Sequence, residues 1–190
     1  MKLCFVSNNK NKLSEVSSIL KNIEIISLDD IGFNEDIPET GSSLEENSQL
    51  KAKCIYDKFK IDCFADDTGL EIESLNGEPG VYSARYAGNR SNSQDNIGLV
   101  LKKMKNFTSR NAQFTTIITL YLDSKVYVFD GSVKGTISSK PIGKFGFGYD
   151  SIFIPKGHDI TFAQMTSEDK NKISHRKKAI KKLNMFLLNK

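Results

Sequence analysis

The chain has 190 residues with a formal net charge of +4, 38% hydrophobic residues and 26% charged residues, which is typical of an ordinary globular protein of one domain or of two small lobes sharing a cleft. No apolar run approaches the roughly 20 residues that span a bilayer. The apolar stretch Leu3–Val6 is too short for a signal peptide, so we expect a cytoplasmic protein with no membrane partner.

The first third of the chain predicts a strand, a helix and a second strand. The strand Leu3–Val6 runs into the polar segment Ser7–Lys12. Apolar residues at helical spacing follow, namely Leu13, Val16, Ile19 and Leu20. With the strand Ile23–Leu28, this order is typical of a βαβ-like opening.

The next elements surround two adjacent aspartates. Ser43 and Glu46 fit a capping box, so we expect a helix to begin there. Its apolar face consists of Ala52, Ile55, Tyr56 and Phe59. A strand at Cys63–Ala65 then leads into the segment Asp66–Gly69. Beyond it, alternating apolar residues and a glycine-rich loop extend to Gly88.

The second half predicts more strand than helix. A helix capped by Ser93 is followed by the strands Phe114–Leu122 and Lys125–Asp130, joined by a tight turn, and Ser132–Ile137 extends that sheet. The loop 141–150, a short strand at Ile152–Ile154 and a helix from about Ser174 complete the chain. We therefore expect an α/β fold with a long central mixed sheet flanked by helices, with residues 1–190 forming a single domain.

Three cysteines, Cys4, Cys54 and Cys63, are widely spaced and flanked by apolar residues. Three thiols cannot form a closed set of disulfides, and no C-x-x-C pair offers zinc-ligand spacing. We expect buried, reduced thiols.

Four polar clusters lie in loops beside apolar strands, where binding sites are commonly built. The first cluster contains Ser7, Asn8, Asn9, Lys10, Asn11 and Lys12. A strand that feeds a helix N-terminus directs backbone N–H groups at one point and favours an anion there. Polar loops of this kind are common, so this segment by itself leaves an anion site and an ordinary loop both open.

The second cluster is the acidic pair Asp66 and Asp67. Adjacent carboxylates at a strand end can hold a hard cation such as Mg²⁺, and one of them can act as a general base. Glu39 and Glu46 are candidate further ligands. The alternative is a plain surface turn, and spacing alone does not decide between the two.

The third cluster is the segment Phe145–Asp150, in which glycines separate aromatic residues. Phe147 or Tyr149 could stack on a flat ligand, and Asp150 could accept a hydrogen bond from a ring N–H. A core-facing hairpin with glycine bends is the alternative.

The fourth cluster is Ser174-His175-Arg176, with Lys170 upstream. It places an imidazole beside a fixed cation at the start of a helix, although a lone histidine there is more often structural. The lysines that follow are interpreted as a solvated helix face, and we expect no polynucleotide partner.

Together the clusters provide a phosphate loop, an acidic pair suited to Mg²⁺, a stacking ring and a basic group, which are the parts of a nucleoside triphosphate site. The sequence contains no G-x-x-x-x-G-K-[ST] motif, which excludes a P-loop enzyme.

The order of these motifs resembles that of the noncanonical purine nucleoside triphosphate pyrophosphatases, the inosine triphosphatase or dITP/XTP pyrophosphatase family. The matching segments are Ser7-x-Asn9-x-x-Lys12-x-x-Glu15, Glu39-Thr40-Gly41, Glu46-Asn47, Lys51-Ala52, Ala65-Asp66-Asp67-Thr68-Gly69-Leu70, Pro79-Gly80-Val81-Tyr82-Ser83-Ala84-Arg85-Tyr86, Phe147-Gly148-Tyr149-Asp150 and Ser174-His175-Arg176. They run from residue 7 to residue 176 and so cover nearly the whole chain.

The resemblance implies an elongated, two-lobed fold with the active-site cleft between the lobes, and a homodimer. It also implies Mg²⁺-dependent attack of water on the α-phosphorus of a purine nucleoside triphosphate, which yields the monophosphate and pyrophosphate. Asp67 is then the general base and a metal neighbour, Glu39 assists the cation, and Asp66 and Glu46 are further candidate ligands.

The resemblance also assigns the substrate contacts. Ser7, Asn9 and Lys12 hold the triphosphate, and Phe147 stacks on the purine. The residues around the purine edge are Asp150, Lys170, His175 and Arg176. The predicted substrate-binding set also includes Asn8, Lys10, Asn11, Thr68, Gly148 and Tyr149.

Two rival interpretations remain. One is a pyrophosphatase for other modified nucleoside triphosphates. The Ser174–Arg176 cluster argues against it, because this cluster favours oxo-purines. The other is a nucleotide- or RNA-binding module without catalysis. The acidic pair argues against it, because a protein that binds a polyanion gains nothing from carboxylates in its groove.

Overall fold

The computed structural model describes residues 1–88 and 92–190. These residues form two compact units, each built from separate segments of the chain. Unit 1 comprises Met1–Asp67, Thr116–Gly131 and Lys177–Lys190, and unit 2 comprises Thr68–Thr115 and Ser132–Arg176.

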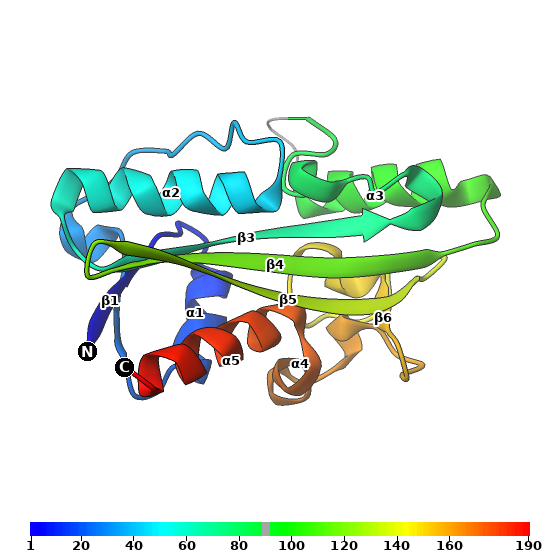
Figure 1. The fold of residues 1–190 in the computed structure, drawn as a ribbon. Coiled ribbons are helices and arrows are strands. Elements are labelled where there is room, and N and C mark those ends of the chain that lie inside the picture. The colour runs from blue at the N-terminus through cyan, green and yellow to red at the C-terminus, as the bar shows by residue number, and fades with distance from the viewer. Residues whose placement is uncertain (89–91) are drawn as a thin grey trace. The chain divides into compact units, whose positions relative to one another are not determined.

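The strands form a six-stranded mixed sheet in the order β2-β1-β3-β4-β5-β6. Their bounds are β1 Lys2–Phe5, β2 Glu24–Ile26, β3 Cys63–Ile72, β4 Asn111–Leu122, β5 Lys125–Ile137 and β6 Phe153–Pro155. The helices are α1 Lys10–Ile19, α2 Leu44–Phe59, α3 Ser93–Lys103, α4 Ser167–Ile173 and α5 His175–Leu188 (Figure 1). β1 pairs in parallel with β2 and β3, whereas β5 and β6 are antiparallel. The predicted α/β class, with helices flanking a mixed sheet, is confirmed.

In unit 1, α2 lies on one face of the sheet, and α1 and α5 lie on the other (Figure 1). The core beneath α1 and α5 includes Leu3, Phe5 and Phe64. The core beneath α2 includes Cys4, Cys63 and Ala65. Because successive strand residues point to opposite faces, Asp66 continues the first set and Asp67 continues the second. The two adjacent carboxylates therefore meet different helices.

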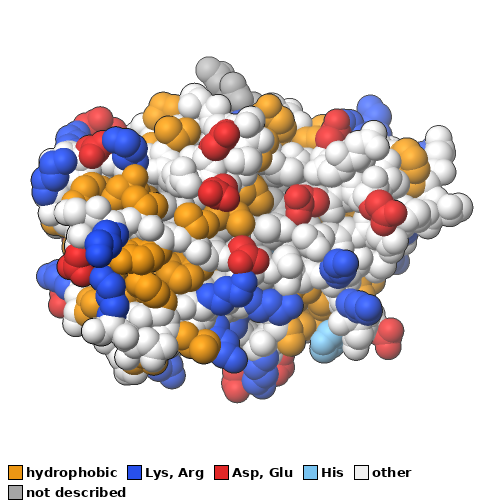
Figure 2. All heavy atoms as spheres, in the orientation of Figure 1, with side chains coloured by type: hydrophobic (Ala, Val, Ile, Leu, Met, Phe, Trp, Pro, Cys, Tyr) orange, Lys and Arg blue, Asp and Glu red, His pale blue; other side chains and the backbone are white. Residues whose placement is uncertain are grey.

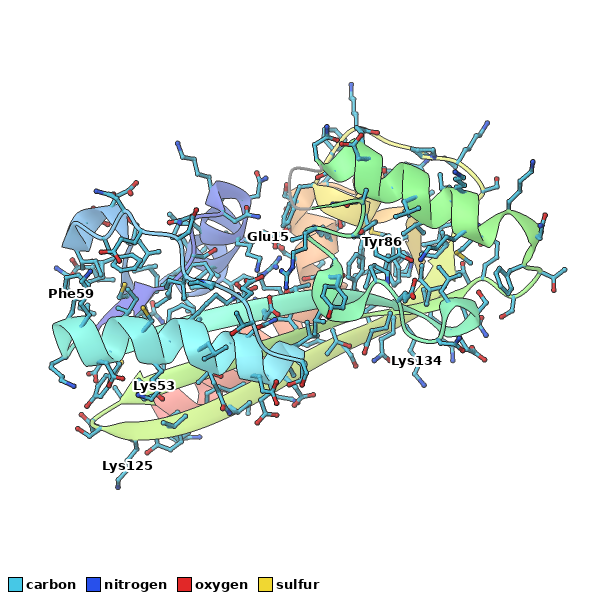
Figure 3. The ribbon with its side chains drawn as sticks, turned by 90° about the horizontal axis from the view of Figure 1, so that it is seen from above. Glu15, Lys53, Phe59, Tyr86, Lys125 and Lys134 are labelled. Atoms are coloured by element: carbon cyan, nitrogen blue, oxygen red, sulfur yellow. The ribbon has the colours of Figure 1, made fainter. Side chains whose placement is uncertain are left out.

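In unit 2, one face of the sheet packs against α3. Leu70 and Phe114 lie in this core together with Ile97 and Val100 of α3. The opposite face is polar, and Thr115 Oγ1 donates a hydrogen bond of 2.6 Å to a Glu71 carboxylate oxygen there. Figure 3 shows Lys134 projecting from β5 on the side away from α3. The period-2 alternation of apolar and polar residues thus separates a core face from an open face.

The main difference from the predicted elements is in β3, which runs without a break from Cys63 to Ile72. The segment Asp66–Gly69 is therefore part of a strand, and the alternative of a plain surface turn is wrong. The predicted hairpin turn is confirmed: Asp123 and Ser124 both have positive φ, at 50° and 62°. Two such residues match the right-handed twist of the strands that they join.

Helix starts differ by one to a few residues from the predicted ones. Asn92, rather than Ser93, is the N-cap of α3, and it forms a capping box with Asp95. Ser43 does cap α2, and the Glu46 carboxylate accepts hydrogen bonds from Ser42 N–H and Ser42 Oγ. The short helix α4 was not predicted.

The cysteines are free thiols, as predicted. Cys4 and Cys63 are buried, and Cys54 is half-buried. Burial raises the pKa of Cys4 to about 11 and that of Cys63 to about 12. The two buried thiols therefore stay protonated and unreactive near neutral pH.

One face of α5 is buried through Ala179, Ile180 and Leu183, and the other carries the exposed Lys178, Lys181 and Lys182. Figure 2 shows Lys and Arg side chains gathered over this helix, below the centre of the view. The predicted solvated basic face is thus confirmed. Within residues 1–88 and 92–190, no helix is long and apolar enough to cross a membrane.

Candidate active site

The segment after β1 forms the cap of α1. Asn9 Oδ1 accepts hydrogen bonds from the backbone N–H groups of Asn11 (3.0 Å) and Lys12 (3.2 Å). Asn9 N–H in turn donates to Ser7 Oγ at 3.2 Å. Because an N-cap asparagine begins a helix as soon as its side chain reaches these N–H groups, Lys10–Lys12 form the first helical turn rather than loop. Two of the N–H groups expected to face an anion are already bonded to Asn9.

Lys12 connects the start of α1 to β3. Its Nζ lies 3.0 Å from Asp66 Oδ1, and the side chain of Asp66 is only 1% exposed. A buried carboxylate is costly unless an opposite charge is near, and Lys12 supplies that charge. The other predicted residues of this segment, Asn8, Lys10 and Asn11, are exposed.

Lys51 lies between two carboxylates. Its Nζ is 2.6 Å from Glu39 Oε1 and 3.2 Å from Asp67 Oδ1. Burial would lower the pKa of Lys51, but the carboxylates of Asp67, Glu39 and Asp66 outweigh it and the pKa is raised. Burial raises the pKa of Asp67, which Lys51 partly offsets. One mostly buried cation is thus paired with two carboxylates.

Asn47 completes the surroundings of Asp67. Its Nδ2 donates to Asp67 Oδ2 at 3.2 Å, and its side chain is fully buried. Both oxygens of the Asp67 carboxylate are therefore bonded, one by Lys51 and one by Asn47.

Glu39 and Asp67 present oxygens to one place, since both bind the same ammonium group. Mg²⁺ prefers oxygen ligands and typically takes one or two carboxylates together with substrate phosphates and water. The pair fits that cation in the presence of a triphosphate. Across the described ranges, 1–88 and 92–190, no group of three or more His, Cys, Asp or Glu side chains is arranged to hold a metal ion by itself.

The other two candidate metal ligands bind elsewhere. Asp66 points to the opposite face of β3 and pairs with Lys12, although its charge still acts on Lys51. Glu46 Oε2 accepts hydrogen bonds from Ser42 N–H (2.6 Å) and Ser42 Oγ (2.8 Å), and these bonds lower its pKa. Glu46 thus secures the segment before α2.

In unit 2, Asp150 organises the aromatic segment. One of its oxygens accepts the Phe147 N–H at 2.9 Å and the Lys170 Nζ at 2.6 Å. Gly146 has a φ of +71°, and a Cβ at that position would lie 2.2 Å from the same oxygen. A side chain cannot fit there, so the sequence motif needs glycine for this close approach.

The half-buried Phe147 ring is flanked by cations. Lys170 Nζ lies 4.9 Å and the Arg176 guanidinium carbon 5.7 Å from its centroid. Both distances are within the range of cation–π attraction. Tyr149, by contrast, is buried, and its hydroxyl donates to Ser83 O at 2.9 Å. Of the two predicted stacking residues, Phe147 is therefore the one with a partly open ring.

His175 and Arg176 begin α5 and are both buried. The imidazole stacks on Phe114, with a centroid distance of 4.5 Å and an interplanar angle of 19°. Arg176 NH2 donates to Thr68 Oγ1 at 3.2 Å. The structure thus brings Thr68, Phe147, Lys170 and Arg176 into one set of contacts within unit 2.

Comparison with known proteins gives the family. Residues 3–186 match the sequence model of the Ham1 family. The chain belongs to the Ham1 family. A protein of Flavobacterium johnsoniae named dITP/XTP pyrophosphatase is 53% identical over 184 residues, which cover 96% of each chain.

Solved structures of Ham1 proteins show the same fold. That of the Staphylococcus aureus Ham1 protein is 40% identical with a TM-score of 0.91, and the match covers 100% of this chain and 99% of that one. A HAM1 protein from Coxiella burnetii is 34% identical with a TM-score of 0.92, and both chains are covered completely.

Lys51 and Asn47 of this Ham1 chain lie in segments that match the family, but no role was predicted for either residue. Both residues lie on the face of α2 that also buries Ser48, Ala52 and Ile55. Polar residues inside an apolar helical stripe are unusual, because an unpaired polar group there is costly. That pattern is the signal in the sequence that could have identified them.

A groove of about 760 Å³ lies on the polar sheet face of unit 2. In the described part of the chain, it is lined by Glu71, Gln113, Lys134, Ile154 and neighbouring residues, and the predicted site residues do not line it. The residues that line this groove are therefore different from the predicted site residues of the Ham1 family motifs.

Proposed function

We propose that this chain is a nucleoside triphosphate pyrophosphatase that hydrolyses noncanonical purine nucleotides of the dITP, ITP and XTP type. Its products are the nucleoside monophosphate and pyrophosphate. The observation that carries the proposal is the buried pairing of Lys51 with Glu39 and Asp67. The name of the Flavobacterium johnsoniae relative, dITP/XTP pyrophosphatase, supports the same substrate class.

In this proposal the triphosphate is bound by the segment at the start of α1. Ser7, Asn9 and Lys12 contact the phosphates, and Asn8, Lys10 and Asn11 belong to the same segment. Lys12 and Lys51 supply fixed positive charge toward the pyrophosphate that leaves. Mg²⁺ held by Glu39 and Asp67 adds further charge neutralisation at the phosphates.

Asp67 is the general base. It accepts a proton from the water whose oxygen forms the new bond to the α-phosphorus. The bond between the α-phosphorus and the bridging oxygen breaks, and its electron pair leaves with the pyrophosphate. Burial raises the pKa of Asp67, which makes the carboxylate a stronger base than an exposed aspartate. The adjacent Lys51 favours the ionised form.

The purine stacks on Phe147. Arg176, Lys170 and His175 present donors to its edge, together with Asp150 and Thr68, and Gly148 and Tyr149 support the loop. A 6-oxo group accepts hydrogen bonds from such donors. A 6-amino group leaves them unpaired, at a cost of roughly 1–3 kcal/mol for each buried group. This difference favours hypoxanthine and xanthine over adenine.

We also propose a homodimer and a cytoplasmic reaction, which the family resemblance and the nature of the substrate support. Size-exclusion chromatography with light scattering should give about twice the single-chain mass of 21.3 kDa.

The test of the reaction is hydrolysis of dITP, XTP, dGTP and dATP by the purified protein with Mg²⁺, with both products identified. We expect monophosphate and pyrophosphate, fastest release from dITP or XTP, and loss of activity with a chelator. Equal rates on all four substrates would support the chemistry and contradict the base selection.

The same assay addresses the rival interpretations. Orthophosphate as the product would contradict attack on the α-phosphorus. Absence of turnover, combined with polynucleotide binding that weakens steeply with salt, would favour a binding module. Faster turnover of modified pyrimidine nucleotides would contradict the assignment of purine nucleotides as the substrates.

A further inference from the structure

Asn47 is a fully buried amide on α2, one helical turn before Lys51. Residues four apart on a helix lie on the same face, so both side chains reach the same part of β3. Asn47 Nδ2 donates to Asp67 Oδ2, and Lys51 Nζ donates to Asp67 Oδ1, each at 3.2 Å. Two successive turns of one helix therefore hold the two oxygens of a single carboxylate.

The orientation of the amide is fixed independently of Asp67. Asn47 Oδ1 accepts the backbone N–H of Gly41 at 2.8 Å. Because a backbone N–H can only donate, the oxygen end of the amide must face Gly41 and the NH₂ end must face Asp67. Asn47 thus offers a donor to the carboxylate in one defined direction.

Gly41 is shaped for this contact. A Cβ at position 41 would lie 2.7 Å from Asn47 Oδ1 and 2.7 Å from the Glu46 Cβ. The Glu39–Gly41 segment can approach α2 this closely only without a side chain at position 41. Asn47 therefore joins three parts of unit 1: the segment that carries Glu39, the helix that carries Lys51 and the strand that carries Asp67.

We propose that Asn47 is a positioning residue that fixes the plane of the Asp67 carboxylate. This inference rests on the proposed function, in which Asp67 takes the proton from the attacking water. A carboxylate bonded through one oxygen can rotate about its terminal torsion, whereas one bonded through both oxygens cannot. Small errors in the placement of a reacting group cost large factors in rate. Asn47 therefore acts on the chemical step through Asp67, without touching the substrate.

The experiment compares Asn47→Leu and Asn47→Asp with the parent enzyme on dITP. Leucine removes both hydrogen bonds at similar volume, whereas aspartate keeps an acceptor for the Gly41 N–H and loses the donor to Asp67. We expect both variants to lower kcat by about 10- to 100-fold while KM changes by less than about 3-fold. If both variants keep kcat within about twofold of the parent, Asn47 does not position Asp67. Should Asn47→Leu fail to fold, Asn47→Asp by itself decides the question.

Ser48→Ala is the matched control. Ser48 is equally buried on the same helix, and its hydroxyl contacts Glu45 O (2.9 Å) and Thr119 Oγ1 (2.7 Å). We expect this variant to lose thermal stability while its kcat stays within about twofold of the parent. A loss of kcat as large as that of the Asn47 variants would mean that any packing defect in α2 has the same effect, and would overturn the inference.

Binding of Mn²⁺ to the enzyme in the presence of a non-hydrolysable dITP analogue, measured by electron paramagnetic resonance, supplies a readout other than turnover. We expect Asn47→Leu to retain the Mn²⁺ affinity within about 3-fold and Asp67→Asn to lose more than about 10-fold. If the two variants lose the metal alike, Asn47 acts on metal binding and the positioning role is wrong. If Asp67→Asn is inactive and Asn47→Leu is fully active, only the positioning role of Asn47 is wrong. If Asp67→Asn is active, the assignment of Asp67 as the general base is wrong as well.

Discussion

Two groups of residues carry the predicted chemistry, and they are held by different forces. The charged cluster of unit 1 consists of Lys12, Glu39, Lys51, Asp66 and Asp67. The ring cluster of unit 2 consists of Phe114, Phe147, Lys170, His175 and Arg176. Ion pairs of 2.6–3.2 Å connect the first cluster, whereas ring stacking and cation–π contacts connect the second.

The difference indicates that the two clusters have different roles in the reaction. Buried charges act strongly on a reaction that moves charge, because a low dielectric weakens their screening. Rings act through contact area and shape, and so contribute to binding of the purine. Changes in the charged cluster should therefore alter kcat, and changes in the ring cluster should alter KM and selectivity.

The largest effect is expected from Asp67→Asn. At saturating Mg²⁺, loss of the general base should lower kcat for dITP by about 10³-fold, within the range typical of such groups, and leave KM within about 3-fold. The measurement is steady-state release of pyrophosphate. Asp57→Asn is the control, because Asp57 is an exposed carboxylate on α2 that pairs with Lys53. A similar loss in both variants would contradict a special role for the buried aspartate.

A smaller effect on binding is expected from Phe147→Ala. Stacking of a base on an aromatic ring contributes about 1–3 kcal/mol, so KM for dITP should rise by about 5- to 150-fold, while kcat stays within about 3-fold. Phe145→Ala is the matched control, because this ring is two residues away and 51% exposed. If kcat falls instead of KM rising, the ring takes part in the chemical step and the division between the clusters fails.

Sequence motifs and the family resemblance predicted Phe147, Lys170, His175 and Arg176 as site residues, but neither Phe114 nor the contacts within the ring cluster. Glycines between aromatic residues predicted an open ring at Phe147 or Tyr149, and one of these two rings is only half-buried. Which ring it is depends on Tyr149, whose hydroxyl bonds to Ser83, 66 residues earlier. A local pattern cannot reveal a partner so distant along the chain.

The charged cluster shows the same limit more clearly. The segment Asp66–Gly69 has the composition of a turn, yet it lies inside β3 because each polar side chain finds a partner far away in the sequence. Lys12 pairs with Asp66, Asn47 and Lys51 pair with Asp67, and Arg176 pairs with Thr68. Tertiary contacts therefore override local preference at this point. The start of α4 was predictable, in contrast, since Thr166 and Asp169 form a local cap.

A still smaller effect is expected from Arg176→Lys. Lysine keeps the charge but loses the planar set of donors, so the preference for dITP over dATP in kcat/KM should fall by about 5- to 30-fold. Arg110→Lys serves as the control. Arg110 binds the carbonyls of Ile137 and Ser138 in the same unit, so its loss should lower the Tm and leave the preference unchanged. An unchanged preference in Arg176→Lys would place the selection of the base in other residues.

The smallest effect is expected from the double variant Lys181→Ala and Lys182→Ala on the exposed face of α5. Lys182 pairs with Asp130, but both side chains are more than half exposed, at 53% and 63%, and such pairs contribute little. We expect kcat/KM for dITP to change by less than about twofold at 0.15 M salt, where charges on the surface are screened beyond about 8 Å. A fall of tenfold or more, which becomes larger at lower salt, would show that the surface lysines steer the triphosphate. The total positive charge of the surface, and not only the buried charges, would then affect the rate. Long-range electrostatic attraction of the substrate would have to be added to the roles of the two clusters.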